Sequence, residues 1–388
     1  MVVISRQLFH EKLEPNVDCS IIHIWSKDCG TAFLSKYWLW NMINGSAKFY
    51  LPVYIVKLLL THKKKDKKTL VRNLLISEIR SIVYGTCMGM TFIFSVCLLR
   101  KIFGRVYYHT ILLLPGMISG TSLLLESRQN QTLNKIIFFN SFLESIWRKI
   151  GIDKKWEIVF FVFFSSILMH LLTNRKEKID FTYFWFYTPP MIDVHEKSND
   201  PCSHEKTCLV HFCEGCSKYF LLGYAVNVIK KLLPRMGSLV KNPLKNMGIF
   251  FSESNLYFGL FIGSYVGFYR VLICYLTRIS NIKKTFHGLI AGLFSGLTYA
   301  ISPNLQVLVI AITTTLQMVY SYISKYLKIN SFWQSQLLFM ICHGYLLQEK
   351  FFSPKTCSSY YAKMIDACTN NVYQEIYKNL IRTFLHEY

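Results

Sequence analysis

Long apolar runs separated by short polar stretches dominate the sequence. The clearest runs occupy residues 81–99, 156–172, 256–277, 286–302, 304–323 and, with more polar residues, 332–348. Because a helix needs about 20 mostly apolar residues to cross a bilayer, each run is a candidate for a membrane-embedded helix. Weaker candidates lie at 37–60, 111–125, 132–147, 181–192 and 218–233. We therefore expect an all-α, polytopic membrane protein with about eight to ten embedded helices.

An internal repeat arranges these runs into two sets. A segment rich in cysteine and histidine at 19–29 recurs at 202–216, and each copy is followed by an aromatic, moderately apolar helix and then by a glycine-containing helix. The two glycine-containing helices end in similar sequences, at 97–102 and 274–279. Near the end of each copy, the apolar run from Trp156 to His170 aligns with the run from Trp333 to His343. This conserved order of features predicts a duplicated helical module.

The repeat also sets the expected domain boundaries. They are an N-terminal Cys/His segment (1–36), a first membrane module (37–172), a connection (173–201), a second Cys/His segment (202–217), a second membrane module (218–348) and a C-terminal tail (349–388). The connection contains Pro189, Pro190 and polar residues, a composition typical of a linker.

Glycines spaced four residues apart mark two consecutive helices in each copy. This spacing puts positions without a Cβ atom on one helix face, so that a neighbouring backbone can approach closely in lipid. Glycine is also common in membrane helices generally, but its recurrence in both copies favours packing seams. The expected seam residues are Gly85, Gly89, Gly116, Gly120, Gly259, Gly263, Gly267, Gly288, Gly292 and Gly296.

The chain is strongly basic, with 44 Lys and Arg against 22 Asp and Glu and a formal net charge of +22. Such a charge suits either nucleic acid or an anionic membrane. The basic residues lie between the apolar runs and do not gather among aromatic residues, which favours membrane lipids and argues against nucleic acid. The run THKKKDKK at 61–68 is either a solvated loop or a contact for anionic head groups or a targeting receptor.

Cysteine and histidine at the start of each copy offer candidate metal ligands. The second segment has thiolates and imidazole close enough together for a four-coordinate zinc site, from Cys202, His204, Cys208, Cys213 and Cys216. The first segment supplies at most three ligands, Cys19, His23 and Cys29. One hypothesis is that the two segments pack together and share a metal ion. The alternative is a structural role, as disulfides or as reduced thiols packed at a helix cap.

Three ionisable residues inside apolar runs are candidates for lipid or ligand contact, because an unpaired polar group at membrane depth costs several kcal/mol. They are Arg270, His170 and His343. Alternatively, the histidines reach the membrane interface and the Arg270 side chain extends to it. No cofactor is expected, because nucleotide-binding and hydrolase motifs are absent. His23 and Asp28 match an acyltransferase spacing, but no substrate-binding block accompanies them, so no enzyme is expected.

The glycine-rich sequences GLFIGSYV (259–266) and FHGLIAGLFSG (286–296) resemble the transmembrane protein 135 family, as do both Cys/His segments. The resemblance runs through essentially the whole chain. It implies a non-enzymatic membrane protein of peroxisomes and mitochondria, connected with peroxisome organisation, mitochondrial fission and fusion balance, and fatty-acid metabolism. Proteins of the organelle membrane or of the fission machinery are the expected partners. The glycine-rich helix pairs are also similar to those of the mitochondrial inner-membrane translocase (Tim) superfamily.

A second function class stays open. Repeated membrane modules often place a transport pathway at the interface between the repeats, so the duplication also fits a transporter or pore for lipid or acyl-chain metabolites. Such a pathway needs a continuous polar or amphipathic route, whereas a membrane organiser needs a packed bundle with exposed loops.

Overall fold

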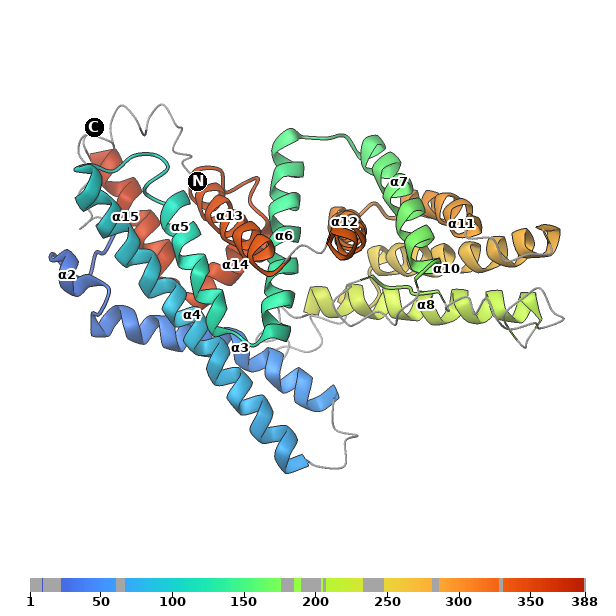
Figure 1. Ribbon diagram of the computed structural model, residues 1–388, viewed down its shortest axis with the longest axis horizontal. Coiled ribbons are helices and arrows are strands. Elements are labelled where there is room, and N and C mark those ends of the chain that lie inside the picture. The colour runs from blue at the N-terminus through green and yellow to red at the C-terminus, as the bar shows by residue number, and fades with distance from the viewer. Residues whose placement is uncertain are drawn as a thin grey trace. The chain divides into compact units, whose positions relative to one another are not determined.

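The computed structural model describes residues 9, 22–60, 67–175, 185–189, 204, 207–232, 248–280, 286–327 and 331–386. Every regular element in those residues is a helix, which confirms the all-α class (Figure 1). The helices form two compact units, one made of Met1–Gly151 with Ile329–Tyr388 and the other of Ile152–Lys328.

The first unit contains nine helical elements in the described residues. They are α2 (Cys29–Ala32), α3 (Lys36–Leu60), α4 (Lys67–Phe103), α5 (Leu113–Ser119), the 3-10 helix η3 (Gly120–Leu125), α6 (Arg128–Ile150), α13 (Ser331–Phe352), α14 (Ser359–Cys368) and α15 (Val372–His386). Local sequence sets the ends of α6: the Ser127 side chain accepts the Asn130 backbone N–H at its start, and Gly151 closes it at a φ of 69°.

The second unit contains six helical elements in the described residues. They are α7 (Lys154–Thr173), α8 (Cys208–Leu232), α10 (Glu253–Ser280), α11 (His287–Gly296), the 3-10 helix η6 (Leu297–Ile301) and α12 (Leu305–Leu327). Helices α8 and α10 run side by side along most of their length (Figure 1).

Four helices in the described residues are long and apolar enough to cross a membrane. They are Lys68–Phe103 in α4, together with α7, α10 and α12. Between 39% and 50% of their most apolar windows is buried inside the protein, so the remaining apolar surface needs lipid to cover it. Together with the all-helical architecture, these four helices identify a polytopic membrane protein.

Four spans are fewer than the eight to ten embedded helices expected from the sequence. Two of the expected runs form short helices instead, Leu113–Leu125 and His287–Ile301. At 1.5 Å per residue neither covers a hydrocarbon core of about 30 Å. Helices α3, α6, α8 and α13 have the length but do not combine it with the apolarity of the four spans.

Several helices within each unit contact one another in the same order, and the duplication itself stays a prediction. In the first unit α3 contacts α4, α4 contacts α5, and α13 contacts both α5 and α6. In the second unit α8 contacts α10, α10 contacts α11, and α7 contacts both α11 and α12. In this comparison α3, α4, α5, α6 and α13 correspond to α8, α10, α11, α12 and α7, whereas α2, α14 and α15 have no counterpart among the described helices.

The last helix of each predicted copy packs in the other copy's unit. Helix α7 follows α6 in the chain but packs against α11, whereas its counterpart α13 follows α12 and packs against α5. The packing units consequently differ from the expected modules 37–172 and 218–348. Sequence order suggested these modules, but the contacts exchange α7 and α13 between them.

Close contacts at glycine hold the exchanged helices in place. A Cβ atom added at Gly116 of α5 would lie 2.7 Å from the Gly344 Cα of α13, and one added at Gly120 would lie 3.1 Å from the Met340 Cα. In the second unit, a Cβ at Gly292 of α11 would lie 2.9 Å from the Ser165 carbonyl of α7. These separations leave no room for a side chain, so the helix backbones themselves meet.

The remaining seam glycines also lie at helix contacts. A Cβ at Gly263 of α10 would lie 2.8 Å from the Cys216 carbonyl of α8, and one at Gly85 of α4 would lie 2.5 Å from the Ser46 Oγ of α3. The others at such contacts are Gly89, Gly259, Gly267, Gly288 and Gly296. All ten expected seam glycines therefore face a neighbouring helix.

The region expected to be a C-terminal tail is part of the first unit's core. Val372, Ile376 and Leu380 of α15 recur every four residues and are buried, which places one helix face against the unit. Lys350 at the end of α13 pairs with Asp366 of α14 and donates to the Ala362 carbonyl at 2.6 Å. Residues 349–386 are consequently structural, because apolar burial and a buried ion pair both fix them.

Enlarging a seam glycine should destabilise the protein. We expect Gly116→Ala to cost about 1–3 kcal/mol, because the added methyl group overlaps the α13 backbone. Thermal unfolding in detergent can be followed with a thiol-reactive dye, since burial raises the pKa of the Cys357 thiol to about 12 and keeps it unreactive in the folded state.

The matched control is Gly248→Ala, because a Cβ at Gly248 would meet nothing within 4 Å. An equal unfolding temperature for the two variants would contradict the prediction, because it would show that the α5–α13 contact accommodates a methyl group at residue 116.

Candidate functional site

The described part of the first Cys/His segment brings His23 and Cys29 together with Cys97 of α4, a set that we call the first triad, whereas Cys19 lies outside the described residues. The ligand atoms of the triad lie within 4.8 Å of one another. His23 is fully buried, and the other two residues are partly buried. Cys29 begins α2, and Cys97 lies in the last part of α4.

The loop before α2 fixes the orientation of the His23 ring. Its Nδ1 donates to the Ser26 carbonyl at 2.6 Å, which assigns the ring proton to Nδ1 and leaves a lone pair on Nε2. Trp25 next to it stacks on Trp38 of α3, with ring centroids 4.6 Å apart, and donates to the Ala32 carbonyl. The segment is therefore anchored to two helices of the first unit.

The second Cys/His segment gives a second triad, His204, Cys208 and Cys274, whose ligand atoms also lie within 4.8 Å of one another. His204 Nε2 is 3.2 Å from the Cys274 Sγ and 3.5 Å from the Cys208 Sγ. The His204 ring stacks on His211, with centroids 4.5 Å apart. Cys208 begins α8, and Cys274 is buried on α10.

The second triad shares only two residues with the expected ligand set. Cys202 lies outside the described residues, Cys213 is exposed on α8, and Cys216 packs beside Gly267. The third member of each triad is a cysteine that the expected ligand sets did not include. It lies on a helix that has seam glycines along one face, as Cys97 of α4 in the first unit and Cys274 of α10 in the second. Sequence reasoning noted both cysteines as equivalent points of the repeat but did not treat them as ligands.

The geometry also bears on the hypothesis of a shared metal ion. Each triad lies wholly within one packing unit and takes all three residues from it. Each Cys/His segment therefore has a partner on its own glycine-faced helix, and no contribution from the other segment is needed to bring three ligand atoms together.

Arg270 lies inside α10 and makes contacts within the second unit. Its Nη1 donates to the His211 carbonyl of α8 at 2.9 Å. Its stem covers Gly215, where an added Cβ would lie 2.8 Å from the Arg270 Cδ. The residue thus joins α10 to α8 beside the second triad, and a lipid or ligand contact for it stays a prediction.

The two histidines of the matching helices α7 and α13 have different surroundings. His343 is 1% exposed, lies among Phe138, Phe339 and Tyr361, and has its Nδ1 3.0 Å from the Tyr361 hydroxyl. His170 is partly buried near the end of α7, where the Asn174 side chain is 3.3 Å from its ring. His343 therefore has the contacts of a core residue, and only His170 lies near a helix end.

The bond between Tyr361 and His343 should contribute to stability. We expect Tyr361→Phe to destabilise the first unit by about 1–3 kcal/mol, because it leaves a buried ring nitrogen without its hydroxyl partner. Chemical denaturation in detergent measures the change.

Tyr360→Phe is the control, since Tyr360 is the adjacent residue and is 43% exposed. Equal effects of the two substitutions would argue against a specific role for the Tyr361–His343 bond.

No solved structure matches the chain. A comparison with protein families does identify one of its regions. Residues 16–152 match the family model of the N-terminal cysteine-rich region of Transmembrane protein 135. The matched region contains the complete first triad and the helices from α2 to α6. The chain therefore carries the N-terminal cysteine-rich region of the transmembrane protein 135 family, which confirms the family resemblance through residues 16–152.

Proposed function

We propose that this protein is a non-enzymatic, multi-pass membrane protein of peroxisomes and mitochondria. In this role it takes part in peroxisome organisation, in the balance of mitochondrial fission and fusion, and in fatty-acid metabolism. The observation that carries the proposal is the family match over residues 16–152. The resemblance to the transmembrane protein 135 family implies a connection with these processes. The four apolar spans support the membrane part of the role.

The packing of the helices fits an organiser. Both units close through direct backbone contact, as at Gly116 with Gly344 and at Gly292 with Ser165. Arg270, which lies in the middle of the apolar stretch of α10, donates to the His211 carbonyl. Rigid, closely packed helices present fixed outer surfaces to lipid and to partner proteins, as membrane organisation requires.

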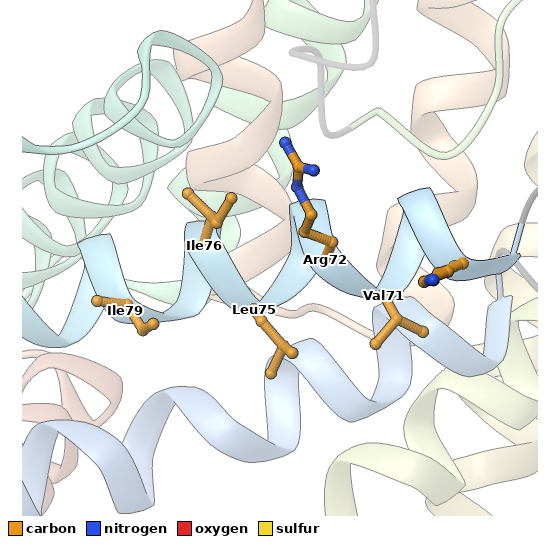
Figure 2. Close-up of a pocket in the computed structure, with 6 residues that line it drawn as sticks. Val71, Arg72, Leu75, Ile76 and Ile79 are labelled. Carbon is orange, nitrogen blue, oxygen red and sulfur yellow. The ribbon is translucent and has the colours of Figure 1, made fainter.

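The N-terminal part of α4 supplies one such outer surface. Figure 2 shows Val71, Leu75, Ile76 and Ile79 projecting from this helix with Arg72 among them. All four apolar side chains are between 40% and 60% exposed. Lys68 lies at the start of the same face, so apolar side chains are combined with cations that suit anionic head groups.

Removing the protein from cells should alter both organelles. We expect fewer or misshapen peroxisomes, a shifted length distribution of mitochondria, and changed fatty-acid oxidation, all restored by re-expression of the full chain. Fluorescence imaging of organelle markers and oxidation of labelled fatty acid measure these effects. Carbonate extraction of the isolated organelles should leave the re-expressed chain in the membrane.

Two results would contradict the proposal. One is normal organelle morphology and fatty-acid oxidation in cells without the protein. The other is flux of a labelled acyl metabolite into vesicles containing the purified chain, above the flux into empty vesicles, which would identify a transporter instead. The Arg270→Leu variant then tests whether such flux passes the second triad.

A further inference from the structure

The two triads have the same composition and the same place in the predicted repeat. Each consists of one histidine before a helix, one cysteine at the first residue of a helix, and one cysteine on the following glycine-faced helix. The sequences that begin at Cys97 and Cys274 are the similar helix endings of the two copies. In each unit the three residues come from separate elements, which must be positioned correctly to bring them together. Because this happens in both units, we infer that the two triads have the same function.

The separations within the second triad fit the ligands of one metal ion. Around a tetrahedral zinc ion with Zn–S of about 2.3 Å and Zn–N of about 2.05 Å, a nitrogen and a sulfur ligand lie about 3.5 Å apart. His204 Nε2 lies 3.2 Å and 3.5 Å from its two sulfur neighbours. In both triads all three ligand atoms lie within 4.8 Å, so a shift of about 1 Å or less brings the two sulfurs to the distance of about 3.8 Å that the same geometry requires.

The first triad has the outer contact that metal-binding histidines usually have. A ligating imidazole normally donates its other N–H to a carbonyl or carboxylate, which orients the ring and fixes its tautomer. His23 does this through Nδ1 to the Ser26 carbonyl, and the stacked Trp25 and Trp38 hold the surrounding loop. The Nε2 lone pair is consequently preset for coordination.

The donor set selects the class of ion. Two thiolates and one imidazole are soft or borderline ligands, which favour Zn²⁺ and Cu⁺ over Mg²⁺ or Ca²⁺. Their two negative charges would neutralise a zinc ion or hold a cuprous ion, and each of these ions suits partly buried sulfur. Three protein ligands leave a fourth position of a zinc ion for water or another ligand.

We propose that each triad binds one thiophilic metal ion, Zn²⁺ or Cu⁺, so that the full chain holds two ions, one per unit. The ion in each site links the Cys/His segment to a glycine-faced helix, α4 in the first unit and α10 in the second. This inference does not rest on the proposed role in peroxisomes and mitochondria, and its test uses the purified chain alone.

Metal content of the purified full-length chain tests the proposal. We expect elemental analysis of detergent-solubilised protein, produced in separate zinc- and copper-supplemented media, to give two ions per chain in at least one medium and so to identify the metal. Cys97→Ser and Cys274→Ser should each lower the content from two ions to one. The double variant should hold none.

Matched cysteine controls separate the triads from neighbouring thiols. One control is Cys87→Ser, because Cys87 lies on the same helix as Cys97. The other is the double variant Cys213→Ser, Cys216→Ser, because both of these cysteines lie on the same helix as Cys208. Both controls should keep two ions. Loss of an ion from the Cys213, Cys216 variant, with full retention in Cys274→Ser, would overturn the assignment of the second triad.

A readout on the unaltered protein covers the case in which a variant does not fold. We expect Cys29, Cys97, Cys208 and Cys274 to resist alkylation until a chelator is added, and a cobalt-loaded chain to show thiolate-to-cobalt charge-transfer absorption. Metal content at background in both media would overturn the proposal. Disulfides joining Cys29 to Cys97 or Cys208 to Cys274 in the native chain, detected by mass spectrometry, would do the same.

Discussion

Direct approach of helix backbones is the interaction on which both units depend. Burial of apolar side chains does not by itself hold helices together in lipid, because the surrounding acyl chains are equally apolar. The attraction must come from close van der Waals contact, which is greatest where no side chain keeps the backbones apart. Gly116 against Gly344, and Gly292 against Ser165, supply this contact in the two units. The short helices α5 and α11 are held against α13 and α7, respectively, by such contacts.

The same seams position the chemistry at the start of each copy. Helix α10 lies along α8 through Gly259, Gly263 and Gly267, and this register places Cys274 beside His204 and Cys208. Helix α4 lies along α3 through Gly85 and Gly89, and Cys97 reaches His23 and Cys29 in the same way. Helix packing and the formation of each triad are therefore parts of one arrangement.

Much of the fold could be predicted from local sequence. Apolar runs such as 156–172 and 304–323 correspond to the spans α7 and α12, because their composition and length are both intrinsic to the segment. The glycine faces were also predictable, since a spacing of four residues places them on one side of a helix. The Cys/His segments identified two ligands of each triad for the same reason: these residues are close together in the chain.

What could not be predicted depends on partners distant in sequence. Nothing near Gly116 indicates that α13, more than 200 residues later, will pack against it. Gly344 was overlooked because it has no glycine four residues away. Cys97 and Cys274 stand far from their histidines, so spacing rules for metal sites do not include them. Charged residues interrupt the apolar positions of α14 and α15, so their sequences do not predict buried helices. One of these charges, Asp366 of α14, pairs with Lys350 of α13.

The exchange of α7 and α13 has a consequence for synthesis of the protein. The second unit is one continuous stretch, Ile152–Lys328, whereas the first begins at the N-terminus and is completed by Ile329–Tyr388. A ribosome therefore finishes the second unit before the first, although the first unit's helices emerge earlier. Until α13 is made, Gly116 of α5 lacks the helix that packs against it, and the nascent first unit must wait for α13 and for the two helices that follow it. The N-terminal half is therefore completed by helices that are made after the whole second unit.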